Sequence, residues 1–271
     1  MEIDGKVYHK ILNEYIDNIQ QELLNRWNDV ELNIDEREIM EVVFGLLSRQ
    51  VSLTIYYLSS PNMWNGDAGT ILLRTIAENI INISWILKED TLKRSRMFIK
   101  YGLGQEKLQL EHRKKEMEGR EVSEEEQEMI EAQEHFLDKE RYSFLTDVIL
   151  GSWNEKSILK IAEEADCKDF YHYVFTPFSN SAHGTWNHII KYSLKQSSNP
   201  LHCFIKRPIF LALEPEVHFA ELSMKYLAKA FGIVDKYYKP KESIQNSYEV
   251  YRTKISNWID KQPKRESTVN C

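Results

Sequence analysis

Glycine and proline are scarce in this sequence. The 271 residues include 10 Gly and 7 Pro, together about half of the usual share in proteins. This scarcity excludes a collagen-like chain, a glycine-rich disordered chain and an all-β fold with many tight turns. Only three cysteines are present, namely Cys167, Cys203 and Cys271. Their number is odd and no two form a CxxC pair, which argues against a disulfide framework or a zinc knuckle and favours a reducing compartment.

The sequence also lacks a targeting segment and a long apolar run. The first 15 residues carry acidic side chains where a signal peptide has a basic region followed by an apolar one. No stretch approaches the ~18 apolar residues of a membrane span. The most apolar segment, 70–87, is interrupted by Arg74, Glu78, Asn79 and Asn82. We therefore expect a soluble cytoplasmic protein that does not enter a membrane.

A basic face is not visible in the composition. The formal net charge is −7, and residues 111–140 alone hold 12 acidic and 5 basic side chains. The remainder of the chain is therefore formally neutral. The acidic segment is either a solvated helical surface or a docking surface for a basic protein partner, and the sequence leaves both interpretations open.

Apolar residues recur at spacings of three and four almost throughout, which predicts an all-α fold of about ten helices. We expect one helical domain over 1–261, with 105–142 as a projecting acidic hairpin and 262–271 as a flexible tail. Residues 193–215 contain three prolines and little periodicity, so we expect a long ordered loop there. The clearest helix predictions are 68–87 with Asp67 as its cap, 90–118, 123–142 with a capping box formed by Ser123 and Glu126, 154–165, 216–237 and 241–259. The segment 170–192 is also predicted to be helical, with Pro177 in a first turn after Thr176 as cap.

The local motifs that announce many enzyme classes are absent. No segment matches the phosphate-binding patterns GxxxxGKS or GxxxxGKT, the zinc-protease pattern HExxH or the hydrolase pattern GxSxG. None of the eight histidines follows a Glu-x-x pattern, which argues against a di-iron or di-manganese helical bundle. We expect neither a metal ion nor a cofactor.

Two polar groups stand out on otherwise apolar helices. Arg74 and Glu78, with Asn82 one turn further, share one stripe of the predicted helix 68–87. One interpretation is an ion pair that ties neighbouring helices together. The other is a guanidinium that Glu78 holds in a fixed pose to bind a phosphate or a carboxylate.

The second group lies around His183. Ser179, His183 and Asn187 share a helical face at four-residue spacing, and Asn180 is their neighbour. A histidine here is either a structural residue or a general acid and base, because an imidazole titrates near ~6.5. Gly184 would let a ligand or another backbone approach His183 closely.

Two further features bear on this group. His188 follows His183 by five residues, a poor spacing for metal chelation on one helix. A bend at Pro177 would bring Tyr173 and His172 to the site.

The order of these residues resembles a widespread family of uncharacterised prokaryotic helical domains. The pattern comprises Arg74-x3-Glu78, Trp153 with Ser157 and Ala162, Tyr173, and Ser179-x3-His183-Gly184. The resemblance implies an all-α fold with a polar site but no established reaction.

The chain is also distantly similar to HEPN domains, helical bundles that often dimerise and include metal-independent ribonucleases of toxin–antitoxin and antiphage systems. The site of those enzymes is an Arg separated from a following His by four to six residues. Here that window before His183 holds Thr176, Pro177 and Phe178 instead. This resemblance therefore implies ribonuclease activity only if Arg74 reaches His183 from another helix.

Taken together, these observations predict a homodimeric helical effector with one site built from Arg74, Glu78, Ser179 and His183, acting on RNA. In that case His183 moves the 2′-OH proton and Arg74 stabilises the phosphorane charge. Two alternatives remain open. In one, the same residues only hold together a sensor or scaffold module; in the other, they bind a small ligand or nucleotide in a regulator.

Overall fold

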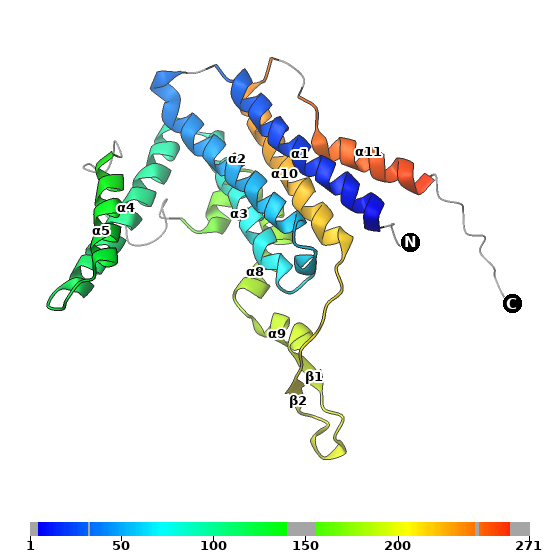
Figure 1. Cartoon of the computed structure of the whole chain (residues 1–271). Coiled ribbons are helices and arrows are strands. Elements are labelled where there is room, and N and C mark those ends of the chain that lie inside the picture. Colours follow the sequence, from blue (N-terminus) through cyan, green and yellow to red (C-terminus); the bar gives the residue numbers. More distant parts are fainter. Residues whose placement is uncertain (1–4, 32, 140–155, 242–243, 261–271) are drawn as a thin grey trace. The chain divides into compact units, whose positions relative to one another are not determined.

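The computed structural model describes residues 5–31, 33–139, 156–241 and 244–260 of the chain (Figure 1). Its helices confirm the predicted all-α, multi-helix class. The chain divides into two compact units, one formed by 1–31, 46–80 and 169–271, the other by 32–45 and 81–168. Whether they form the single predicted domain stays a prediction. Trp153, residues 140–142 of the predicted hairpin and the predicted tail lie outside the described residues.

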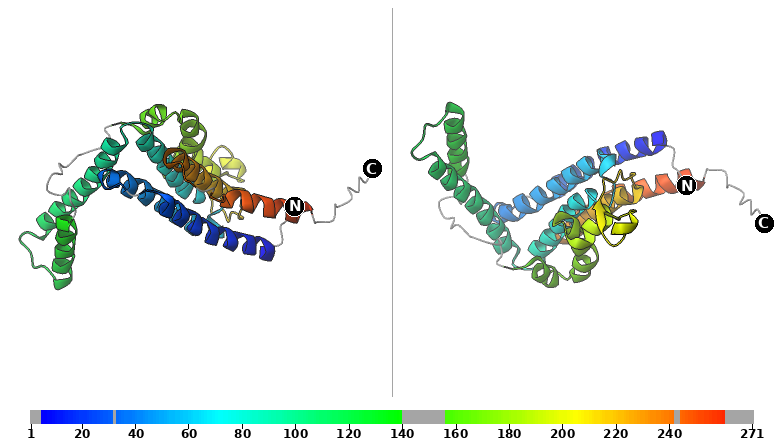
Figure 2. Two further views of the ribbon diagram at one scale, coloured as in Figure 1. Left: turned by 90° about the horizontal axis from the view of Figure 1, so that it is seen from above. Right: turned by 90° about the horizontal axis from the view of Figure 1, so that it is seen from below.

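The first unit is built around long amphipathic helices. α1 (Gly5–Asp29), α10 (Val217–Tyr238) and α11 (Ser247–Asp260) lie side by side (Figures 1 and 2). The unit also contains the last part of α2 (Arg37–Leu58) and the first part of α3 (Gly69–Lys88). Its core includes the buried side chains of Leu12, Tyr15, Ile19, Leu47, Tyr57, Leu73, Ile76, Leu227, Phe231 and Tyr251.

A buried ionic network joins three of these helices. The guanidinium of Arg26 on α1 donates to both carboxylate oxygens of Asp235 on α10, at 2.7 Å each. Its Nη1 donates to Glu22 Oε1 at 3.0 Å, and its Cζ lies 4.1 Å from the ring centroid of Phe231. The other oxygen of Glu22 accepts from the backbone N–H of Ser247 at the start of α11, at 3.0 Å. The Arg26 side chain is only 5% exposed, so its charge is balanced by protein groups rather than by water.

Removing this guanidinium should strongly destabilise the first unit. Arg26→Met leaves two carboxylates without their cation, and we expect a loss of ~3–5 kcal/mol in the free energy of unfolding. Urea unfolding followed by circular dichroism measures this loss. The matched control is Arg252→Met, because Arg252 forms an exposed pair with Glu249 at 3.9 Å and such pairs contribute ~1 kcal/mol or less. Equal losses in the two variants would contradict the network's role.

The second unit contains a helical hairpin. α4 (Thr91–Met117) and α5 (Glu124–Lys139) pack against each other (Figure 1). The predicted capping box is confirmed at the start of α5. Ser123 Oγ accepts from the Glu126 N–H at 3.2 Å, and Glu126 Oε2 accepts from the Ser123 N–H at 3.1 Å. The small core between the two helices consists of Leu103, Leu110, Ile130 and Leu137.

Ionisation of Glu126 completes this capping box. The Arg120 guanidinium and the Ser123 N–H lower the pKa of Glu126 from 4.5 to about 2. A carboxyl with a depressed pKa contributes its stabilisation above the unfolded pKa and loses it as pH falls through the folded pKa. We therefore expect NMR amide shifts at the start of α5 to change between pH ~4.5 and ~2. In Arg120→Ala the midpoint of this change in amide shifts should move toward pH 4. An unchanged midpoint would contradict the role of Arg120 in lowering the pKa of Glu126.

The segment 170–192, predicted to be helical, is divided into short pieces, namely α7 (Lys168–Phe170), a π-helix (Tyr171–Phe175), α8 (Thr176–Ala182) and α9 (Trp186–Tyr192). Pro177 lies in the first turn of α8, as predicted. Thr176 is not a cap, because Phe175 before it is already helical and no side-chain capping bond forms. Gly184, at φ +55°, separates α8 from α9. A left-handed glycine ends a helix at little steric cost.

The segment predicted as a loop contains two short antiparallel strands. β1 (Leu194–Gln196) pairs with β2 (Lys206–Pro208), and a 3-10 turn (Pro200–His202) lies between them. Residues 194–211 form an extension beyond α9, hereafter called the arm (Figure 1). Strand pairs this short are hard to find by periodicity, because three residues do not establish an alternation.

Two helical segments pass a test of length and composition for crossing a membrane. They are Ile34–Leu58 and Gly69–Lys88, and 61% of the apolar window of each is buried within the structure. A buried core helix has the same composition. The cytoplasmic location therefore stays a prediction.

Candidate functional site

Polar side chains line the contact between α3 and the α8–α9 segment in the first unit. Three side-chain bridges join the two sides: Arg74 to Ser179, Thr70 to Ser181, and Asp67 to His188. We call this contact the polar seam. It consists of Asp67, Thr70, Arg74 and Glu78 on one side and Ser179, Ser181 and His188 on the other.

Arg74 is the most constrained residue of the polar seam. Its Nη1 lies 3.0 Å from Glu78 Oε2, and its Nε donates to Ser179 Oγ at 3.3 Å. The Ser179 hydroxyl in turn donates to the Phe175 carbonyl at 3.0 Å. The Phe175 ring centroid lies 4.9 Å from the guanidinium carbon, which adds a cation–π contact. The Arg74 and Glu78 side chains remain 24% and 30% exposed, and Nη2 has no partner among the described residues.

The π-helix is what presents Phe175 and Ser179 to Arg74. Phe175 is buried, and its ring stacks on that of Tyr171 with centroids 5.3 Å apart. On the other side of this segment, Phe170 and Phe178 contact Tyr226 of α10 edge-on. Burial there raises the pKa of Tyr226 to about 12. Local π-helical turns often occur at functional sites, and this one lies directly before α8.

The other two bridges lie nearer the start of α3. The Thr70 hydroxyl donates to Ser181 Oγ at 2.6 Å, and Ser181 donates to the Phe178 carbonyl at 2.8 Å. His188 Nε2 lies 2.7 Å from Asp67 Oδ1. This carboxylate orients the imidazole and sets its tautomer. The Asp67 side chain therefore binds His188 and forms no bond to a helix amide among the described residues, so its predicted role as the cap of α3 is wrong.

His183 is exposed at the end of α8. It follows Ser179 by one helical turn, and its backbone N–H donates to the Ser179 carbonyl at 3.1 Å. Its side chain forms no hydrogen bond or ion pair with another described residue. The structure thus places His183 one turn from the residue that binds Arg74, with its imidazole open to solvent.

A Cβ at Gly184 would meet no atom within 4 Å among the described residues. The predicted close approach of another backbone is therefore wrong within this chain, whereas the approach of a ligand stays a prediction. The positive φ of Gly184, which disfavours a side chain, is a sufficient reason for the glycine.

The remaining predicted site residues contribute less. Asn180 Oδ1 accepts from the Thr185 hydroxyl at 3.3 Å, inside the turn between α8 and α9. Asn187 is exposed, and Tyr173 on the π-helix is 80% exposed. Neither side chain contacts Arg74 through a hydrogen bond in the described part of the chain. Asn82, expected on the Arg74 stripe, is buried.

The sequence analysis missed Asp67, Thr70, Ser181 and His188 as members of the site. One signal was available for the first two, since positions 67, 70, 74 and 78 follow the three- and four-residue spacing of one helical stripe. No comparable signal pointed to His188, because α8 and α9 are separate helices and their joint face depends on the turn at Gly184.

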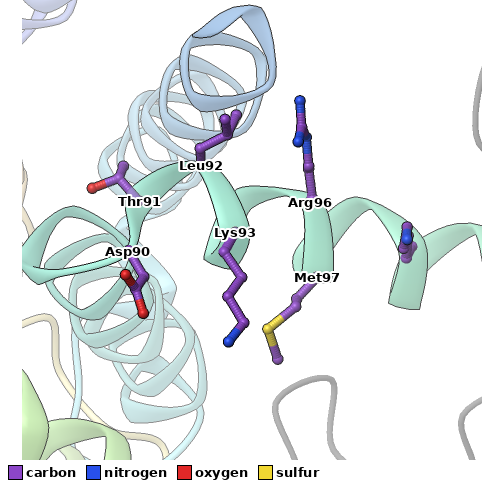
Figure 3. Close-up of a pocket in the computed structure, with 7 residues that line it drawn as sticks. Asp90, Thr91, Leu92, Lys93, Arg96 and Met97 are labelled. Carbon is purple, nitrogen blue, oxygen red and sulfur yellow. The ribbon is translucent and has the colours of Figure 1, made fainter.

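A hollow lies on α4, in the second unit. Its lining includes Lys93, Arg96 and Lys100, together with Asp90, Thr91, Leu92 and Met97. Figure 3 shows that Lys93 and Met97 point to one side of α4 whereas Arg96 points to the other. Arg96 also binds Glu38 at 3.2 Å. These cations do not converge on one ligand, which makes the hollow a weaker candidate than the polar seam.

Metal-ligating side chains do not gather in the described ranges. No group of three or more His, Cys, Asp and Glu residues there is placed to hold a metal ion. The polar seam itself contains a guanidinium, hydroxyls, carboxylates and one imidazole, that of His188.

Fold and site together define an all-α protein with a polar, partly open contact between helices. Residues 40–200, more than half of the chain, match the model of a family described as a family of unknown function (DUF5677), and the chain belongs to this family. The predicted membership in an uncharacterised helical family is thus confirmed, and the match spans the whole polar seam. No curated protein matches the chain, and no solved structure matches it.

A substitution at Gly66, which faces Tyr192 of α9, tests whether α9 docks against the start of α3. A Cβ at Gly66 would lie 2.1 Å from the hydroxyl of Tyr192 and 3.1 Å from its Cζ. We expect Gly66→Ala to lower the free energy of unfolding by ~1–3 kcal/mol, and Tyr192→Phe in the same chain to recover part of that loss. Chemical denaturation measures both effects.

The matched control is Gly232→Ala on α10, where a Cβ meets no atom within 4 Å. There alanine should be neutral or stabilising, because it favours a helix. A Gly66→Ala variant as stable as the original chain would show that α9 does not dock as described.

Proposed function

We propose that this protein is a cytoplasmic, metal-independent ribonuclease of a toxin or antiphage defence system. The observation that carries the proposal is the pose of Arg74. Glu78, Ser179 and Phe175 hold its guanidinium beside α8, and Nη2 has no partner in the described part of the chain. One helical turn beyond Ser179, the imidazole of His183 is open to solvent. A fixed cation together with an accessible acid–base group suits a phosphodiester substrate.

The reaction needs only groups of this chain and the RNA itself. The His183 imidazole takes the proton of the ribose 2′-OH, and the 2′-oxygen forms a bond to the adjacent phosphorus. The bond from phosphorus to the 5′-oxygen breaks, and that oxygen takes the proton back from His183. Arg74 donates to the phosphoryl oxygens as negative charge builds up on them. The products are a 2′,3′-cyclic phosphate and a free 5′-OH.

Partners follow from the same proposal. RNA is the substrate, and a nucleotide that binds at Arg74 would act as an inhibitor. We further propose that the protein works as a homodimer, in line with its resemblance to HEPN domains. The acidic α4–α5 hairpin is the proposed docking surface for a basic partner protein.

A second candidate is a non-catalytic scaffold or sensor. The observation that favours it is that two of the three guanidinium nitrogens of Arg74 already have protein partners. In this case the polar seam only fixes α8 against α3, and substitutions in it change stability rather than activity.

Cleavage of a labelled 20-nucleotide RNA by the purified full-length chain tests the proposal. We expect products that end in a 2′,3′-cyclic phosphate, at a rate that EDTA does not change. His183→Ala and Arg74→Lys should each lower the rate at least ~100-fold, because a positioned acid–base group contributes ~10²–10⁴-fold. Arg74→Lys keeps the charge but loses the forked donor geometry.

His9→Ala is the matched control, since His9 is an exposed histidine on α1. It should leave the rate unchanged. Absence of cleavage by the original chain, or a His183→Ala variant as active as the original, would overturn the proposal. Absence of cleavage together with a large fall in melting temperature of Arg74→Lys would favour the scaffold.

A further inference from the structure

Acidic residues are absent from one long segment of this acidic protein. Residues 170–213 contain no Asp or Glu, although the whole chain contains 42. The same segment carries four cations, namely Lys191, Lys195, Lys206 and Arg207. It includes α8, α9 and the arm, so the positive charge lies next to His183 in the chain. The net charge of the whole chain is still negative, because the acidic helices carry more charge than this segment.

The strand register places two of these cations directly opposite each other. Lys195 on β1 pairs with Arg207 on β2, and Gln196 pairs with Lys206. Side chains of directly paired residues lie on one face of the ladder, about 4.5–5.5 Å apart at Cβ, and like charges there destabilise it. No described carboxylate forms an ion pair with Lys195, Lys206 or Arg207. A closely spaced row of anions would offset this repulsion.

Exposed rings and apolar side chains alternate with the cations along the arm. Leu201 and Phe204 between the strands are each 79% exposed, and Phe210 after β2 is fully exposed. Trp186 at the start of α9 is 61% exposed. Isolated apolar side chains are common on surfaces, but a group of rings among unpaired cations is the composition of surfaces that bind single-stranded nucleic acids.

We propose that the arm binds single-stranded RNA, with its phosphates at Lys195 and Arg207 and its bases stacked on Phe204 and Phe210. The choice of RNA rests on the proposed function, because the same strand would run on to His183 for cleavage. Charge complementarity selects a polyanion, and the exposed rings select one with unpaired bases. A second copy of the chain presents the same cations on its own arm, which would repel the first.

Fluorescence anisotropy with a labelled 20-nucleotide 2′-O-methyl RNA tests the arm on the unaltered full-length chain. This RNA lacks the nucleophilic 2′-OH, so binding is measured without cleavage. Lys195→Gln with Arg207→Gln should weaken binding at least ~10-fold at low salt. The slope of log affinity against log salt should become shallower by about 0.7 per lost phosphate contact. Phe204→Ala and Phe210→Ala should each weaken binding at least ~5-fold.

The matched control is Lys225→Gln with Lys236→Gln, which removes the same charge from exposed positions on α10. It should retain most of the affinity, and circular dichroism should show all variants folded. Arm variants that bind as well as the original chain, or a control that loses as much as they do, would overturn the proposal. So would equal binding to a duplex of the same length, because paired bases cannot stack on Phe204.

Other occupants of the arm give different results. If Phe204→Ala and Phe210→Ala dissociate an oligomer in sedimentation analysis but leave RNA affinity unchanged, the arm is a contact between copies. If the arm binds phosphatidylserine vesicles but not RNA, it is a membrane contact. Either result overturns the inference.

The experiments distinguish a failure of the proposed ribonuclease activity from a failure of the proposed RNA binding by the arm. Arm-dependent binding of the 2′-O-methyl RNA without cleavage of ordinary RNA would refute the ribonuclease alone. Cleavage that needs His183 but not the arm would refute the arm alone.

Discussion

The contact between the Arg74 guanidinium and the Ser179 hydroxyl governs where α8 lies along α3. α3 is apolar on most sides, and its buried residues belong to the core. On the one polar stripe that remains, Arg74 needs hydrogen-bond acceptors, because a partly buried cation without partners is costly. Glu78 supplies one acceptor, and Ser179 supplies the other from α8. Since Ser179 must reach Arg74, the position of α8 along α3 is set to within about one helical turn.

The same requirement positions the neighbouring groups. Once Ser179 is held at Arg74, Ser181 meets Thr70, and His188 on the next helix meets Asp67. Each bridge satisfies polar groups that would otherwise lose their bonds to water, so a shift of α8 by one turn would break all three. The left-handed turn at Gly184 directs α9, and β1 continues from it into the arm. The polar seam thus depends on one docking contact, and the position of α9 and the start of the arm follow from it.

Charge is strongly segregated along this chain. The net charge of −7 equals that of residues 111–140 alone, while residues 170–213 carry cations and no carboxylates. The composition as a whole therefore shows no basic face, whereas residues 170–213 form a locally basic segment. Average charge says little about binding when the two signs occupy different elements, because electrostatic fields weaken within about a Debye length in salt.

The fold class, the capping box at Ser123 and the polar stripe of α3 were all predictable from the sequence. They depend on contacts between residues within about four positions, for which side-chain spacing and helix geometry suffice. The break between α8 and α9 at Gly184, the strand pair of the arm and the Asp67–His188 pair were not predictable. Asp67 and His188 are 121 residues apart, and such distant contacts depend on how helices dock.

The sequence alone thus determined an all-α protein. It also determined that the most apolar helix carries polar residues and that two further helices form an acidic hairpin. Only the tertiary structure decided which side chains meet at that helix: Ser179, Ser181 and His188 across the polar seam, and Lys195 opposite Arg207 in the arm. The physical reason is that helical periodicity specifies which face a side chain occupies, whereas packing and hydrogen-bond satisfaction between distant segments specify what that face contacts.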